Sequence, residues 1–196
     1  MKRLLLVAVM VLLASLTIPA LAAPSDRHGT SDWDEIFAQY DIRTIAAAPA
    51  GITPLDIGTP AELRRFMRQI ASHGTSRLEM ESASPALLTY GITESCVHLR
   101  KTMSWVPFPT FNLWADVWIV GSGSFWEIGD VYEWVGLTGI TTFADLTDTW
   151  TYHRVSTDHQ SVTIKGGGIV THYFVIKNLI KLYSQSVELT ILYSLR

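Results

Sequence analysis

The sequence predicts a mainly β fold with α+β organisation, in which one or two N-terminal helices precede an antiparallel β-sandwich or open barrel. Three observations predict it. An amphipathic helix pattern stands early in the chain, apolar residues alternate with a period of two through the second half, and glycine-containing turns separate the alternating stretches. Strands that follow one another without intervening helices pair antiparallel and pack as sandwiches or barrels.

The N-terminus, residues 1–22, has the three regions of a secretory signal peptide. A basic pair at residues 2–3 precedes a mostly apolar stretch at 4–16, and Ala-Leu-Ala at 20–22 is a small-x-small cleavage site. A membrane anchor needs about 20 predominantly apolar residues, and Pro19 interrupts the run before that length. We therefore expect cleavage before Ala23, a secreted mature chain, and no transmembrane segment after cleavage.

The remainder divides into two parts. Residues 23–58 are expected to be a flexible N-terminal segment, with a short helix that ends at Tyr40. Residues 59–196 are expected to form a single globular domain with a helix at 60–72.

That helix has the clearest local signal in the chain. Thr59 suits the N-cap, Pro60 suits the first helical position, and Glu62 completes a capping box. Apolar residues then recur at helical spacing, and three arginines occupy the other side as a solvated face rather than an anion site. The apolar positions are Leu63, Phe66, Met67 and Ile70, and the arginines are Arg64, Arg65 and Arg68.

From about Cys96 the apolar period becomes two. Residues 111–120 alternate, Gly121–Ser124 turn the chain, and residues 125–135 return, which predicts a β-hairpin. The glycine triplet at 166–168 is expected to be a flexible bend between strands. Further strands are predicted at 97–104, 147–155, 161–165, 169–176 and 186–195.

The aromatic and glycine positions of this half of the chain carry a family resemblance. Their spacing resembles a group of uncharacterised exported β-rich proteins of Gram-positive bacteria. The resemblance implies a β fold and a location outside the cytoplasm, and it implies no activity and no functional residues. The positions are Trp118, Tyr132 and Trp134, followed by residues 150–152, 168–174 and 183–187.

Composition and motifs argue against several classes of function. The formal net charge is −3 and no basic cluster stands out, so we expect no nucleic-acid partner. The chain contains no nucleophile elbow, zincin motif, P-loop or dinucleotide fingerprint. The single cysteine, Cys96, cannot form an intrachain disulfide, and it is expected to be a buried thiol or a site of intermolecular pairing.

Two clusters of titratable residues could carry chemistry. His153 and His172 could hold Zn²⁺ together with a carboxylate such as Asp158. A glycosidase-type pair of acids could come from Asp116, Glu127, Asp130 and Glu133. Ordinary half-buried histidines and solvent-facing acids explain both patterns more simply, so we expect no metal site and no cofactor.

Tryptophan is the unusual feature of the predicted strands. Trp114, Trp118, Trp126 and Trp134 are the candidate binding residues, and Trp114 and Trp118 share a face. An exposed row of this kind stacks on sugar rings or lies at a membrane interface, whereas a buried row is cross-strand packing. We expect Trp114 and Trp118 to be buried, because a strand that is apolar on both faces would otherwise favour aggregation.

These patterns predict an exported, non-enzymatic β-domain protein that binds a carbohydrate or another ligand at the cell surface or in the medium. Two alternatives stay open: a secreted hydrolase acting on glycans, and a membrane-active or antimicrobial protein. A binding protein should have an aromatic surface without convergent titratable groups. A glycan hydrolase should have two acids, or a histidine and an acid, facing one cleft, and a membrane-active protein should cause leakage of liposomes.

Overall fold

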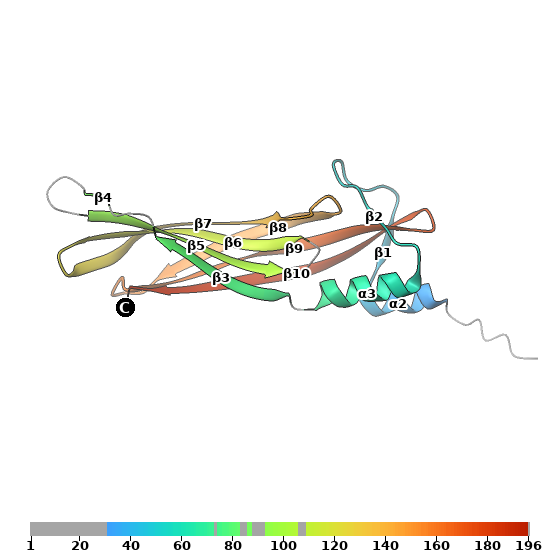
Figure 1. Cartoon of the computed structure of the whole chain (residues 1–196), viewed down its shortest axis with the longest axis horizontal. Coiled ribbons are helices and arrows are strands. Elements are labelled where there is room, and N and C mark those ends of the chain that lie inside the picture. The colour runs from blue at the N-terminus through green and yellow to red at the C-terminus, as the bar shows by residue number, and fades with distance from the viewer. Residues whose placement is uncertain (1–30, 73, 83–85, 88–92, 106–108, 196) are drawn as a thin grey trace, which may run out of the picture. The chain divides into compact units, whose positions relative to one another are not determined.

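The structure, a computed structural model, describes residues 31–72, 74–82, 86–87, 93–105 and 109–195. The expected signal peptide and its cleavage site lie outside the described residues. From Asp32 onward the chain contains two helices and ten strands within these described segments, and the strands form two sheets (Figure 1). The mainly β, α+β, sandwich-like fold that the sequence predicts is confirmed.

The two helices are α2 (Asp32–Tyr40) and α3 (Pro60–Ala71). The capping box at the start of α3 is present: the Glu62 amide donates to Thr59 Oγ1 at 3.2 Å, and the Thr59 amide donates to Glu62 Oε2 at 3.1 Å. The predicted helix is therefore confirmed, and it ends one residue earlier than expected. Its four predicted apolar residues are all buried.

Both helices pack at one end of the first sheet. The Phe66 ring of α3 lies edge-on to Phe174 at a centroid distance of 5.7 Å and 6.3 Å from the ring of Phe143. On the polar side of α3, Arg64 donates to Glu35 of α2 at 3.1 Å, so the two helices lie beside each other. In the part of the chain that the structure describes, neither helix has the length and apolar content needed to cross a membrane.

The first sheet, sheet A, is built around one long strand. β9 (Ser161–Ile176) pairs antiparallel with β10 (Leu179–Ser194) on one side and with β8 (Ala144–Val155) on the other. Two short strands from the N-terminal segment complete it. β1 (Arg43–Ile45) pairs with β10, and β2 (Leu55–Asp56) lies parallel to β9.

The second sheet, sheet B, is a meander with the order β3-β5-β6-β7, and β4 pairs with the end of β5. Its strands are β3 (Thr75–Ser82), β4 (Ala86–Leu87), β5 (Thr93–Ser104), β6 (Thr110–Ser122) and β7 (Phe125–Thr138). β6 and β7 form the predicted hairpin, with its turn at residues 123–124. The register between them shifts at Val117/Ile119, which marks a β-bulge.

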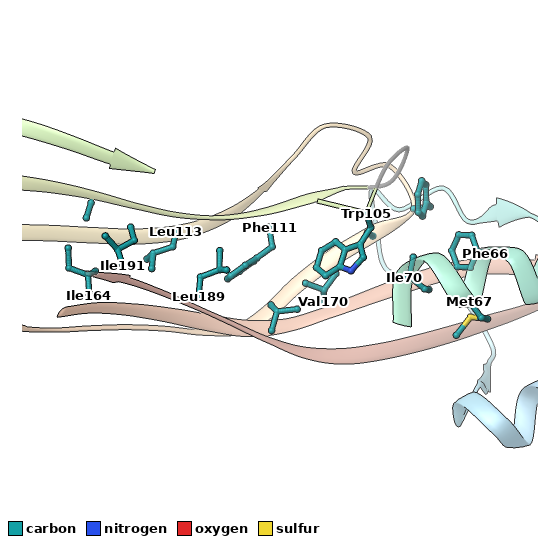
Figure 2. Close-up of a cluster of buried hydrophobic side chains, with 14 of the residues drawn as sticks. Phe66, Met67, Ile70, Trp105, Phe111, Leu113, Ile164, Val170, Leu189 and Ile191 are labelled. Atoms are coloured by element: carbon teal, nitrogen blue, oxygen red, sulfur yellow. The ribbon is translucent and has the colours of Figure 1, made fainter. Parts of the chain in front are cut away.

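The core lies between the inner faces of the two sheets and continues under α3 (Figure 2). Alternate residues of β6, beginning with Phe111 and Leu113, point toward Leu189 and Ile191 of β10 and toward Ile164 of β9. Trp105 and Ile70 extend this apolar layer toward Phe66 and Met67 of α3. A contiguous layer of this kind is the main stabilising feature of a chain without disulfides.

The glycine triplet is not a bend, so that prediction is wrong. Residues 166–168 lie within the continuous strand β9. A Cβ on Gly166 would lie 2.6 Å from Val135 Cγ1 and 2.7 Å from Leu113 Cδ1. A Cβ on Gly167, on the opposite face, would lie 2.8 Å from the Trp150 ring. These glycines are needed because neighbouring side chains approach the backbone closely on both faces.

Candidate functional site

The outer face of sheet B, which points away from sheet A, carries the candidate site. Along β6, burial alternates: the odd-numbered residues from Phe111 to Val117 are fully buried, whereas Trp114, Asp116 and Trp118 are partly exposed. The antiparallel register lines these residues up with neighbours on both sides. Trp114 lies between Arg100 of β5 and Trp134 of β7.

An aromatic platform, formed by Trp114, Trp134 and Tyr132, dominates this face. The Trp114 and Trp134 rings stack with centroids 6.0 Å apart and an interplanar angle of 13°. Trp134 is 45% exposed and Tyr132 is 60% exposed. These side chains therefore present flat apolar area to solvent while their backbone is held in the centre of a sheet.

Arg100 adds a fixed cation to the platform. Its guanidinium carbon lies 5.8 Å from the centroid of the Trp114 ring, within the range of a cation–π contact. Arg100 Nε and Nη2 both donate to Asn112 Oδ1, at 3.0 and 2.8 Å. Asn112 is fully buried, and its own amide donates to Thr138 Oγ1 at 2.9 Å. This chain of hydrogen bonds orients the Arg100 side chain before any ligand arrives.

Polar side chains surround the stacked tryptophans in a shallow depression of about 400 Å³. β3 contributes Glu79 and Glu81, whose register partners on β5 are Arg100 and His98. Carboxylate, imidazole and guanidinium groups thus lie around one aromatic surface. The lining comprises Glu79, Met80, Glu81, His98, Leu99, Arg100, Trp114, Asp116 and Trp134.

Next to the platform, Cys96, His98 and Asp116 form a cluster. His98 Nδ1 lies 2.6 Å from Asp116 Oδ1 and 4.0 Å from Cys96 Sγ. The three potential ligand atoms all lie within 4.8 Å of one another. Burial, followed by the nearby charges of Asp116 and Glu94, raises the pKa of the Cys96 thiol.

The four tryptophans predicted as binding residues do not all lie together. Trp114 and Trp134 come together, and Trp118 lies on the same face opposite Cys96. Trp126 is apart from them at the hairpin turn, where its Nε1 donates to the Gly123 carbonyl at 3.1 Å. The expectation that Trp114 and Trp118 are buried is wrong: the opposite face of β6 packs into the core, and α3 packs on sheet A instead.

The predicted zinc ligands do not converge. His153 pairs with Ile164 in the β8–β9 register, whereas His172 pairs with Ala144 at the far end of β8. His153 Nδ1 instead lies 2.9 Å from Glu133 Oε2 of β7, which links the two sheets. The Asp158 carboxylate accepts hydrogen bonds from its own turn, including the Gln160 amide at 3.2 Å.

One predicted pair of acids, Asp116 and Glu133, is separated as well. Asp116 lies on the outer face of sheet B beside His98, whereas Glu133 lies on the inner-face side against His153. Glu127 and Asp130 are exposed residues of β7. Asp116 and Glu133 therefore cannot face one substrate across a cleft, as glycoside hydrolysis by two acids requires.

Sequence reasoning missed the Cys96, His98 and Asp116 cluster, although part of its signal was present. Cys96 and His98 are two residues apart, so they share a face of any strand that contains both. Asp116 joins them only through the β5–β6 register.

No family model matches the chain, and neither the curated proteins nor the solved structures include a significantly similar one.

Proposed function

We propose that the protein is an exported glycan-binding protein whose aromatic platform stacks on sugar rings. The observation that carries the proposal is the stacked Trp114–Trp134 pair, open to solvent and surrounded by hydrogen-bonding side chains. A pyranose ring has an apolar face of C–H groups and an edge of hydroxyls. The flat face of an indole packs against the C–H groups, and carboxylates and guanidinium groups form hydrogen bonds with the hydroxyls.

Rigidity supports this function. The platform lies on paired strands rather than on loops, and Arg100 is held in place through the buried Asn112. Pre-ordered side chains lose little conformational entropy when a ligand binds, so a modest contact area can give measurable affinity. An open, shallow surface also fits one stretch of a longer polysaccharide better than it fits an enclosed small molecule.

Local charge narrows the class of glycan. Glu79, Glu81 and Asp116 line the depression, and Arg100 is the one fixed cation among its lining residues. These carboxylates would repel the negative charges of a polyanionic ligand, so a polyanionic ligand is disfavoured here. We therefore propose a neutral glycan as the ligand, rather than a phosphate-rich or uronate-rich polymer.

Export is the other part of the proposal. The basic, apolar and small-residue regions at residues 1–22 support it, as does the family resemblance in the sheet-forming half of the chain. A glycan-binding surface is useful where polysaccharides occur, at the cell wall or in the medium. The lack of intrachain disulfides does not oppose export, because the continuous core between the sheets stabilises the fold.

The direct test is isothermal titration calorimetry of the mature chain with hexamers of N-acetylglucosamine and of glucose. Trp134→Ala removes the exposed half of the stacked pair and should weaken binding about tenfold or more, equivalent to about 1.4 kcal/mol. The matched control is Trp150→Ala, since Trp150 is 42% exposed but lies over Gly167 on sheet A.

Thermal melts of both variants check that the fold is intact. Equal affinities of Trp134→Ala and the wild type, or no binding of either hexamer by the wild type, would contradict the proposal. Release of new reducing ends would favour a glycan hydrolase. Leakage of dye from phospholipid vesicles would favour a membrane-active protein.

A further inference from the structure

We propose that Cys96, His98 and Asp116 form a binding site for a divalent transition-metal ion, with Zn²⁺ as the ion that fits best. The inference goes beyond glycan binding and does not depend on it. It rests on the only group of three or more potential metal-ligating side chains that the described residues bring together.

Backbone geometry places the three ligands without loops. Cys96 and His98 are two residues apart on β5, so their side chains leave the same face of the strand. The register places Asp116 of β6 directly opposite His98. The β-bulge between β6 and β7 begins at the next register position, and bulges are frequent beside functional sites.

The distances are close to those of a metal site. Tetrahedral zinc, with bonds of about 2.0–2.1 Å to nitrogen or oxygen and about 2.3 Å to sulfur, places N and O ligands about 3.3 Å apart and N and S ligands about 3.6 Å apart. His98 Nδ1 lies 2.6 Å from Asp116 Oδ1 and 4.0 Å from Cys96 Sγ. An ion would therefore move His98 Nδ1 and Asp116 Oδ1 apart by about 0.7 Å and bring Nδ1 and Cys96 Sγ closer by about 0.4 Å, changes that side-chain rotation provides.

The ligand types select the metal. One thiolate, one imidazole and one carboxylate are suited to Zn²⁺ and neighbouring transition metals, whereas Ca²⁺ and Mg²⁺ require oxygen ligands. The His98 and Asp116 side chains are 51% and 29% exposed, so the site opens toward solvent above the buried Cys96. Three protein ligands with an open side leave a fourth position for water.

Electrostatics also favours a cation. The Asp116 carboxylate belongs to the cluster, and Glu94 lies two residues before Cys96 on the same face of β5. Both negative charges attract a divalent ion, which would then stabilise the thiolate. On binding, the S–H bond of Cys96 breaks, its proton passes to solvent, and an S–Zn bond forms. Coordination would use the lone pair of His98 Nδ1, so the proton that bridges Nδ1 and Asp116 in the metal-free protein would pass through solvent to Nε2.

The same geometry disfavours a thiol nucleophile. A cysteine relay uses one imidazole nitrogen to accept the thiol proton and the other to contact the carboxylate. Here both neighbours approach His98 at Nδ1. A shared nitrogen suits a bound ion, which would replace the His98–Asp116 hydrogen bond by two metal–ligand bonds.

The test uses Co²⁺ as an optical probe of the reduced, EDTA-treated mature chain. Titration should reach one Co²⁺ per chain and produce the near-ultraviolet thiolate-to-cobalt charge-transfer band, with visible bands of a tetrahedral ion. Zn²⁺ should displace it. Cys96→Ser should abolish the charge-transfer band, and Asp116→Asn should weaken Co²⁺ binding at least about tenfold.

The matched control is His153→Gln. His153 also contacts a carboxylate, that of Glu133, but this pair does not belong to the cluster that contains Cys96. It should bind Co²⁺ as the wild type does. Absence of the charge-transfer band in the folded wild type, or its persistence in Cys96→Ser, would overturn the proposal. Trp134→Ala should retain the band, so failure of the metal site and failure of glycan binding are distinguishable.

Discussion

His172 should make the stability of the fold depend on pH. It is fully buried, and neither of its ring nitrogens has a hydrogen-bond partner among the described residues. Aromatic rings from four separate segments lie against it, and of these only Tyr183 can ionise, far above neutral pH. The rings belong to Phe66, Trp105, Phe143 and Tyr183.

The sign and the size of the effect follow from this burial. Desolvation lowers the pKa of His172 from 6.5 to about 4, so the folded state binds fewer protons than the unfolded state between these values. This group imposes no pH-dependent penalty above pH 6.5, and it destabilises the folded state progressively as the pH falls from 6.5 toward 4. At about 1.4 kcal/mol per pH unit, the total loss is about 3 kcal/mol. That is a large share of a typical stability of about 5–15 kcal/mol.

Urea unfolding of the wild type and of His172→Leu, at several pH values from about 7.5 to 4.5, measures this effect. Leucine has a similar volume and no polar atom, so the variant should be at least as stable as the wild type at neutral pH. Its relative stability should increase by about 1.4 kcal/mol for each pH unit below 6.5. Groups that titrate in both proteins cancel in the difference. Parallel stability curves would show that His172 does not titrate abnormally, and would refute the reasoning.

Two further predictions concern the close approach of the sheets and the processing of the chain. Gly166→Ala should cost about 1–3 kcal/mol in urea unfolding, because its methyl group would overlap Val135 and Leu113. Gly58→Ala, where the added Cβ meets only an ordinary contact at 3.6 Å, should be nearly neutral, and equal losses in the two variants would contradict the argument. Mass spectrometry of the exported protein should find a mature N-terminus at Ala23, whereas an intact N-terminus beginning at residue 1 would exclude cleavage.

Local signals in the sequence were sufficient for the helices and for the hairpin. The capping box of α3 depends on residues three positions apart, and the β6–β7 turn depends on a short glycine-rich segment. Interactions of this short range are visible in sequence. The glycine triplet was wrongly predicted to be a bend. The need for glycine there comes from side chains of three other strands, and the positions of those side chains cannot be read from residues 166–168.

The face of β6 that enters the core was the harder question. Both faces are rich in apolar residues, so alternation alone showed that Trp114 and Trp118 share a face without showing which face is buried. Asp116 between them was the available signal, because a carboxylate is rarely buried without a partner. The Cys96, His98 and Asp116 cluster required the β5–β6 register, which the hydrophobic pattern of separate strands does not specify.

The free edge of β10 has a consequence for self-association. Among the described residues, β1 pairs with Ile180–Leu182 only, so the rest of this long strand has no neighbour on that side. An uncovered strand is a template on which a second molecule can add its own strand. Lys101 of the other sheet donates to the Thr190 carbonyl at 2.6 Å. An incoming strand would have to displace this ammonium group and bury its charge, so one lysine disfavours edge-to-edge pairing of two molecules along β10.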